Sequence, residues 1–322
     1  MTVIDYSEER YYRHTGRAPI IGTTLAALAA WAAAVALAVM YGYADLYLKV
    51  ADILSAFITI LFAAAGGFAV YGVLRWARVR NLPIAVLVAV TAAMLLFYGS
   101  WVVWESALAQ RAGATSVGWV PWRLFQRPWA VWRVAQHINA TGTFTLNGSD
   151  VTGVELWLFW AGEALLLIGA TIAIPIAMLR KAAFCETCGA WCRTSKDIVR
   201  VQHFDEELVR EHLEAKDFEY LIRLGPASKI TPVHFKVDLQ HCPRCKETNL
   251  LTVSRVKVSY YNGRPIETAK AVVDRLWIDA AQAEAVRALP KLLTAKAQVA
   301  PPPQEQEMPG SAETPGSTET PT

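Results

Sequence analysis

Residues 20–43 read IIGTTLAALAAWAAAVALAVMYGY, a stretch that contains no charged side chain. A helix needs about 20 apolar residues to cross the roughly 30 Å hydrocarbon core of a bilayer. Three further apolar runs follow, and their limits are Ala51–Leu74, Leu82–Trp104 and Val154–Leu179. A large soluble helical core is disfavoured because buried soluble helices are seldom so free of charge for so long. The sequence therefore predicts a multi-pass α-helical membrane domain with four transmembrane helices over residues 20–180.

The first apolar run is longer than the core of a cleavable signal peptide, although arginines precede it. A secretory signal has an apolar region of roughly 7 to 15 residues, whereas this run extends from Ile20 to Tyr43. We therefore expect it to be retained as a membrane anchor.

Lysine and arginine are distributed unevenly around the four runs. Arginines are found in the N-terminal tail of residues 1–19, between the second and third runs, and directly after the fourth run at Arg180. Short segments rich in these residues stay on the cytoplasmic side of a membrane. The link of residues 105–153 also carries arginines, but we place it outside because the rule weakens for long loops. The pattern predicts cytoplasmic N and C termini, in what we expect to be a bacterial inner membrane.

The polar part of the chain contains all five cysteines. Four of them form two Cys-x-x-Cys pairs, in Phe184-Cys-Glu-Thr-Cys-Gly189 and in His241-Cys-Pro-Arg-Cys-Lys246. Each pair places two thiols on a tight turn, and two such turns together supply the four thiolates of a tetrahedral structural zinc site. A reducing cytosol keeps thiols free for a metal. The expected ligands of Zn²⁺, with iron as a minor alternative, are Cys185, Cys188, Cys242 and Cys245.

These two turns resemble the knuckles of the zinc-ribbon family, over roughly residues 184–277. The resemblance implies a small α+β fold in which the four cysteines are the ligands, within a cytosolic domain of residues 181–298. About fifty residues separate the pairs, against roughly 15 to 20 in the simple spacing, so an insertion is expected. Residues 205–225 predict that insertion to be an amphipathic helix with an acidic first turn.

The segments after the second pair have the patterns of a hairpin and a helix. Apolar and polar residues alternate around Val258, and Asn262-Gly263 is a typical hairpin turn. Asp279, with Gln282 three residues later, predicts the capped start of a last helix. We expect Pro290 to end or kink that helix.

Two other kinds of chemistry are compatible with the cysteines. A Cys-x-x-Cys pair also serves thiol redox reactions, and four thiols also bind iron–sulfur clusters. The fifth cysteine, Cys192, is a spare thiol, an alternate ligand or a small buried residue, and we favour the last. A histidine could replace one thiolate, and the candidates are His203, His234 and His241.

One acidic residue, Glu163, lies well inside the fourth apolar run. An ionisable group at membrane depth is costly and is a functional candidate by default. We interpret Glu163 as an intramembrane polar site in which a protonated acid is bonded to a neighbouring helix. Part of an ion or proton path is the alternative.

The outer link contains a cluster of tryptophans interleaved with arginines, namely Trp119, Trp122, Trp129 and Trp132. Indole rings paired with arginine favour the headgroup layer of a membrane. We therefore expect an interfacial helix, followed by a hairpin that turns at Asn147-Gly148. Binding of an aromatic or glycan ligand by the tryptophans is the alternative.

The remaining features favour a protein that is not an enzyme. Residues 299–322 are rich in Pro, Ser, Thr and Glu and predict a disordered tail. Common phosphate-loop, dinucleotide, zinc-protease and serine-hydrolase motifs are missing from the sequence. A formal net charge of +3 is too small to predict nucleic-acid binding, and no small-molecule substrate is identifiable.

The sequence thus favours an adaptor or assembly factor that presents a structural zinc module at the cytosolic face. Its expected partners are the lipid bilayer and another protein, or a second copy of the chain, through the transmembrane bundle. The alternatives are a transport or channel component that uses Glu163, and a membrane-bound thiol or redox enzyme.

Overall fold

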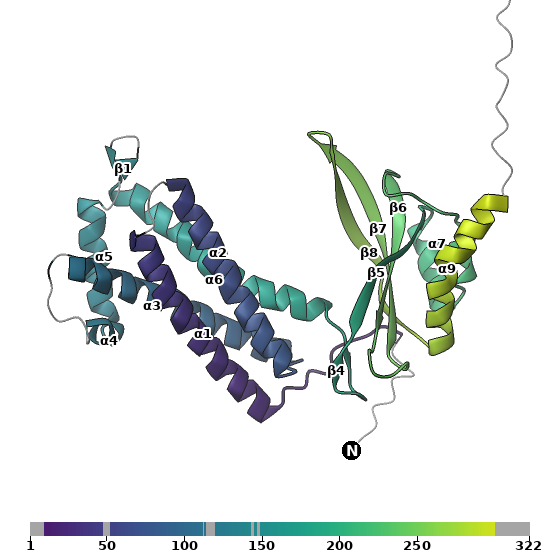
Figure 1. Cartoon of the computed structure of the whole chain (residues 1–322), viewed down its shortest axis with the longest axis horizontal. Helices are drawn as coiled ribbons and strands as arrows, with labels where there is room; N and C mark the ends of the chain where they lie inside the picture. The colour runs from purple at the N-terminus through teal and green to yellow at the C-terminus, as the bar shows by residue number, and fades with distance from the viewer. Residues whose placement is uncertain are drawn as a thin grey trace, which may run out of the picture. The chain divides into compact units, whose positions relative to one another are not determined.

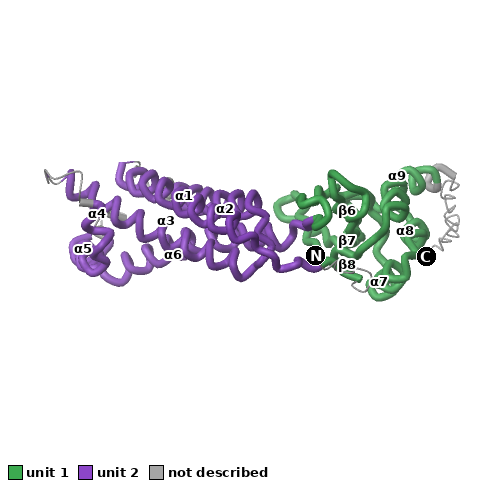
Figure 2. Tube along the Cα trace, turned by 90° about the horizontal axis from the view of Figure 1, so that it is seen from below, with its two compact units in different colours: residues 1–12, 185–322 green, residues 13–184 purple. Residues whose placement is uncertain are grey.

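The computed structural model describes residues 10–47, 52–111, 113, 120–142, 145–146 and 149–299. The chain divides into two compact units (Figure 2). One unit, Arg13–Phe184, is helical. In the other, Cys185–Thr322 is joined by Met1–Tyr12, and its described part is built around an antiparallel sheet.

The helical unit contains four helices that are long and apolar enough to cross a membrane, as the sequence predicts. They are α1 (Ile20–Tyr47), α2 (Asp52–Trp76), α3 (Leu82–Arg111) and α6 (Gly153–Lys181). Their outer faces expose large apolar side chains, for example Phe57 at 65%, Leu87 at 63% and Leu165 at 74%. Apolar surface this extensive is unfavourable in water and suits a lipid environment.

Small residues bring these helices close together. Helix α1 packs on α3 through alanines at every fourth position, Ala26, Ala30, Ala34 and Ala38. Helix α2 packs on α6 at Gly67, where an added Cβ would lie 2.8 Å from the carbonyl oxygen of Ala170. Close backbone approach of this kind is what small residues permit between membrane helices.

The link between α3 and α6 contains two helices where the sequence predicts one. They are α4 (Val120–Phe125) and α5 (Pro128–Thr141). The break falls at Gln126–Arg127 because Pro128 has no backbone N–H to continue the first helix and suits the first turn of the second. The short strands β1 (Thr145–Leu146) and β2 (Ser149–Asp150) then pair antiparallel, as a hairpin requires. Its predicted turn, Asn147-Gly148, lies outside the described residues.

The second unit has an α+β fold in which helices cover one face of a sheet (Figure 1). The four-stranded antiparallel sheet has the order β5-β6-β7-β8, and β3 and β4 form a separate pair. The hydrophobic core of this unit lies between the sheet and the helices. It includes Leu213, Leu221, Phe235, Leu276 and Val286. The elements are β3 (Phe184–Cys185), β4 (Ala190–Trp191), β5 (Arg193–Gln202), α7 (Glu206–Glu214), α8 (Glu219–Arg223), β6 (Val233–His241), β7 (Asn249–Tyr261), β8 (Arg264–Ile278) and α9 (Ala280–Val299).

The inserted helix expected over residues 205–225 is divided into α7 and α8. The chain turns between them at Lys216, whose φ of 66° lies outside the helical region. The expected amphipathic cover is nevertheless present, because Leu213 and Leu221 are fully buried. Asp205 caps α7 by accepting a hydrogen bond from the backbone N–H of Glu207 at 2.8 Å.

Helix α9 confirms its predicted start but not its predicted end. The backbone N–H of Gln282 donates to Asp279 at 2.8 Å, and that of Asp279 donates to Gln282 at 3.0 Å. The helix then continues through Pro290 to Val299, so of the two effects predicted for this proline, an end of the helix is wrong, and a kink stays a prediction. Leu289 and Leu293 are both buried on either side of the proline. Their packing offsets the hydrogen bond that the proline cannot make.

The N-terminal segment Arg10–Tyr12 extends the sheet at β8, which the sequence does not reveal. Tyr11 forms an antiparallel bridge with Leu276. The backbone N–H of Tyr12 donates to the carbonyl of Arg275 at 2.9 Å, and that of Trp277 donates to the carbonyl of Arg10 at 3.0 Å. The N-terminal segment therefore covers the edge of β8 at residues 275–277, where an unpaired strand would invite aggregation.

Candidate metal centre

The four cysteines of the two Cys-x-x-Cys pairs lie on two turns at strand ends. Cys185 ends β3, and the turn through Cys188 leaves at Gly189 with a φ of 58°, which favours glycine. Cys242 follows β6, and its backbone N–H donates to the carbonyl of Thr248 at 3.0 Å to close the second turn. Register between β6 and β7 therefore fixes the second turn.

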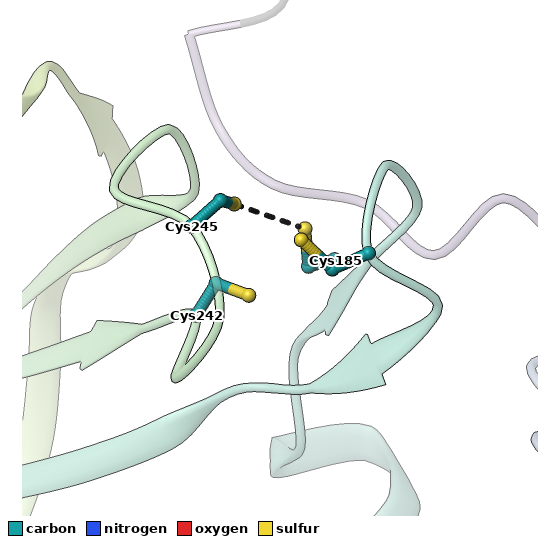
Figure 3. Close-up of side chains that lie close together, drawn as sticks. Cys185, Cys242 and Cys245 are labelled. Carbon is teal, nitrogen blue, oxygen red and sulfur yellow. Dashed lines mark hydrogen bonds between the residues drawn. The ribbon is translucent and has the colours of Figure 1, made fainter.

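All four Sγ atoms lie within 4.8 Å of one another. The Cys185 and Cys245 sulfurs are 3.7 Å apart (Figure 3). Four sulfurs placed tetrahedrally about 2.3 Å from a zinc ion would be separated by about 3.8 Å. A disulfide requires about 2.05 Å, so this geometry is that of free thiols arranged around one point. The structure thus brings together all four predicted ligands in a cluster that could hold a metal ion.

The electrostatics of the cluster favour a bound cation. Hydrogen bonding to Cys245, followed by burial, raises the pKa of Cys188 to about 12. Burial also raises the pKa of Cys185. Burial acts to raise that of Cys245 as well, but the backbone N–H of Glu247 and neighbouring donors lower it to about 7. The four thiols cannot all ionise together without a positive charge between them, which a metal ion supplies as it displaces their protons.

Hydrogen bonds around the two turns hold the cysteines in place. The backbone N–H of Arg244 donates to the Cys242 sulfur at 3.4 Å, which stabilises a thiolate. The Arg244 guanidinium donates to the carbonyl of Cys188 at 3.3 Å and so connects the two turns. Asn249, which is buried, donates to the carbonyl of Lys246 at 2.6 Å. Such outer contacts orient metal ligands and tune their basicity.

The other candidate ligands do not join the cluster. Cys192 is buried, and burial raises its pKa to about 12, which makes it an inert thiol. His203 stacks on Phe235 with ring centroids 5.0 Å apart. His234 accepts a hydrogen bond at Nε2 from Arg200 Nη1, 2.9 Å away, and donates from Nδ1 to the carbonyl of Thr231.

His241 precedes Cys242 but lies outside the group of four. Burial, then Arg287 and Arg193, lower the pKa of its imidazole, so it is neutral at pH 7. Its Nδ1 atom is buried and has no hydrogen-bond partner within the described part of the chain. The residue therefore lies beside the metal cluster with an unused polar atom.

The predicted polar residue of the membrane region, Glu163, has a partner on another helix. The hydroxyl of Tyr41 on α1 donates to Glu163 on α6, and it also bonds Thr59 on α2 at 2.8 Å. Both carboxyl groups, Glu163 and Asp45, line a cavity of about 30 Å³. A space of this size holds one or two waters or a small ion.

Two acidic residues of this region are not identified from the sequence. Asp45 follows Tyr41 by one helical turn, beyond the predicted end of the first run. Glu105 lies inside α3, which continues to Arg111, and not in the outer link as predicted. It is only 4% exposed, and both carboxyl oxygens lack a hydrogen-bond partner among the residues that the structure describes. The signal that could reveal both is the helical spacing of polar residues at the ends of apolar runs.

The described tryptophans of the outer link are exposed. Trp122 is 56% exposed, Trp129 64% and Trp132 44%, and Trp119 lies outside the described residues. Trp132 also contacts Trp157 of α6, with ring centroids 5.1 Å apart. Exposed indole rings next to helices that could span a membrane suit the headgroup layer.

Comparison of this chain with protein-family models, with curated proteins and with solved structures finds no match. The two units themselves therefore define the class of protein. Four apolar helices suggest a membrane protein, and a separate small sheet region carries four cysteines that could bind a metal.

Proposed function

We propose that this chain is an integral membrane adaptor or assembly factor whose zinc-ribbon-like unit is stabilised by a structural Zn²⁺ ion. The observation that carries the proposal is the group of four thiols within 4.8 Å of one another. A closed set of four protein ligands leaves no open position for a substrate, which is typical of structural zinc. One ion suits the 3.7 Å sulfur spacing, whereas a multi-iron cluster needs its cysteines farther apart. A single iron is the remaining alternative, which metal analysis distinguishes.

The N-terminal pairing supports an arrangement in which both ends of the chain share one side of the membrane. Arg10–Tyr12 contacts β8 directly, which requires both segments to be in the same compartment. The arginine distribution favours the cytosol for that compartment. A cytosolic location also keeps the four thiols reduced.

The surface that we assign to partner binding is the β7–β8 arm, which comprises residues 257–268. Pairing of β6 with β7 ends at Lys257, so the arm extends past the other strands (Figure 1). Tyr260 is 61% exposed and Tyr261 is 68% exposed, next to the turn at Asn262. Exposed aromatic side chains on a rigid projection are the residues that most often anchor protein interfaces.

Replacing Tyr260 and Tyr261 with serine is expected to release a specific protein partner at least tenfold more readily. Affinity purification of full-length protein in mild detergent, followed by quantification of each co-purified protein, measures this. Ile230→Ser is the matched control because Ile230 is 69% exposed and lies outside the arm. A chain that purifies alone, or a partner that is insensitive to the tyrosines, would refute the adaptor role and leave the metal site unaffected.

A second function, transport of a small cation or proton, is favoured by the cavity between the helices. Its walls include Glu163, Asp45 and Tyr41, at a depth where ionisable groups commonly mark ion pathways. A carboxyl group that bonds Tyr41 can exchange a proton with a water or ion in that space.

Glu163→Gln is expected to reduce proton flux into proteoliposomes at least tenfold, because an amide cannot release a proton. Glu155→Gln is the matched control, since Glu155 is exposed in the first turn of the same helix. A pH-sensitive dye inside the vesicles reports the flux. Equal flux in Glu163→Gln and in the wild type would remove this second candidate.

A further inference from the structure

A cavity of about 520 Å³ adjoins the second cysteine turn. It is bounded by the start of β5, by the turn of residues 242–246, and by the first turns of α9. Small-molecule sites commonly enclose about 300 to 1,000 Å³. The cavity is therefore large enough for a small organic ligand as well as for water.

The charged groups that line this cavity are mostly basic. Four cationic side chains contribute to its wall against one carboxylate, Glu284. They are Arg193, Arg244, Lys246 and Arg287. Arg287 forms an ion pair with Glu284 at 2.9 Å, while Arg193 and Lys246 form no ion pair with any described residue.

Backbone and imidazole groups add unused polar atoms. Ala280 and Ala281, the first two residues of α9, also line the cavity, and their N–H groups have no acceptor in the described part of the molecule. A helix N-terminus carries roughly half a positive charge and favours anions. The buried Nδ1 of His241 likewise has no partner among described residues, and His241 belongs to the same wall.

A metal held by four thiolates would carry a net charge of −2, which is the main competing explanation for the basic residues. The positions of these basic residues indicate that the charge of the thiolate cluster accounts for only some of them. Arg244 reaches the cysteine turns directly, but Arg193 belongs to β5 and Arg287 to the third turn of α9. The net charge around the cavity is still positive when the thiolate cluster and Glu284 are counted together with the four cations and the helix N-terminus.

From this arrangement we infer that the cavity binds a phosphate-bearing anion. Arginine matches phosphate oxygens in bidentate geometry, and the wall residues that the structure describes include no Phe, Tyr or Trp that would stack on a base. The phosphate belongs either to a soluble phosphorylated compound or to a lipid headgroup. Because the ligand would contact Arg244 and Lys246, on either side of Cys245, its binding stabilises the second cysteine turn. This inference extends beyond the adaptor role and does not depend on the β7–β8 arm.

Inorganic pyrophosphate is the probe, titrated calorimetrically into metal-loaded full-length protein in neutral detergent. We expect saturable binding that is weakened at least about tenfold by the double change Arg193→Gln and Arg287→Gln, since each arginine makes charge-assisted hydrogen bonds. Glu284→Gln removes the only carboxylate among the described residues of the wall and is expected to tighten binding about threefold. Lys229→Gln is the control, because Lys229 is exposed and lies outside both the cavity and the β7–β8 arm.

A second arm of the experiment identifies the source of the phosphate. Protein is placed in lipid nanodiscs of zwitterionic lipid with or without phosphatidic acid. If phosphatidic acid competes with pyrophosphate, and the double variant loses this competition, the ligand is a lipid headgroup. If pyrophosphate binds equally in both discs, the ligand is soluble.

Two results would overturn the inference. One is the lack of saturable binding in either arm, or binding that the double variant leaves unchanged. The other is loss of zinc from the double variant without any anion effect, which would show that the basic residues only balance the thiolates. If every variant contains one equivalent of zinc, a change in anion binding is not caused by loss of the metal centre.

Discussion

Replacing Cys185 and Cys242 with serine is expected to remove the metal and unfold the sheet unit. Each change takes one ligand from a different turn, so neither turn retains both of its thiols. Structural zinc contributes on the order of 10–16 kcal/mol to the folding of small domains, which exceeds or equals the usual stability of such a domain. Elemental analysis should show zinc falling from about one equivalent per chain to less than about 0.1. Limited proteolysis should then cleave within residues 185–299 while the apolar helices stay intact.

Cys192→Ser provides the matched control for this prediction. Cys192 is buried within the same unit but is not one of the four clustered residues, so its serine variant should retain the metal. A double Cys185/Cys242 variant that stays folded but loses thiol turnover would instead support a redox role. Wild-type protein that contains neither zinc nor iron would refute the metal site.

Gly67→Val is expected to separate helices α2 and α6. The new Cβ would lie 2.8 Å from both the carbonyl oxygen of Ala170 and the Cβ of Ile174, distances that side chains do not tolerate. One of these neighbours is backbone and cannot rotate away, so we expect a loss of about 3 kcal/mol. Thermal unfolding of the detergent-solubilised protein, followed by loss of monodisperse material in size-exclusion chromatography, measures this.

Gly72→Val tests whether the effect depends on packing or merely on the loss of a glycine. It lies on the same helix, but nothing is found within 4 Å of an added Cβ, and valine there should be neutral or slightly stabilising. Equal unfolding temperatures for the two variants would show that α2 and α6 do not pack as described.

Features that depend on local composition could be predicted from the sequence. Apolar runs reveal the four long helices because a bilayer imposes a minimum length. The Cys-x-x-Cys spacing predicts the four clustered thiols, because each pair forms a turn of its own. The predicted ends of the helices are less accurate near Asp45 and Glu105, because helical hydrogen bonding continues past the apolar residues.

Features that depend on distant segments could not be predicted in this way. The hydrogen bond between Tyr41 and Glu163 joins two helices, and the residue pattern of neither helix indicates which residue is the partner. The same is true of Arg193 and Arg287, which share one cavity only because β5 and α9 meet in the folded unit. The turn between α7 and α8 depends on a left-handed Lys216, which sequence preference does not favour.

The pairing of Tyr11 with Leu276 has a consequence for biogenesis. Residues 10–12 leave the ribosome long before β8 is made, so if the four apolar helices cross a membrane, as we propose, the sheet is completed only after they have been inserted. A chain in which one helix fails to insert would place these residues across the bilayer from their strand. Its sheet would lack the N-terminal strand beside residues 275–277 and would stay open to proteolysis, so in the proposed topology the folding of the sheet unit depends on correct insertion of the helices.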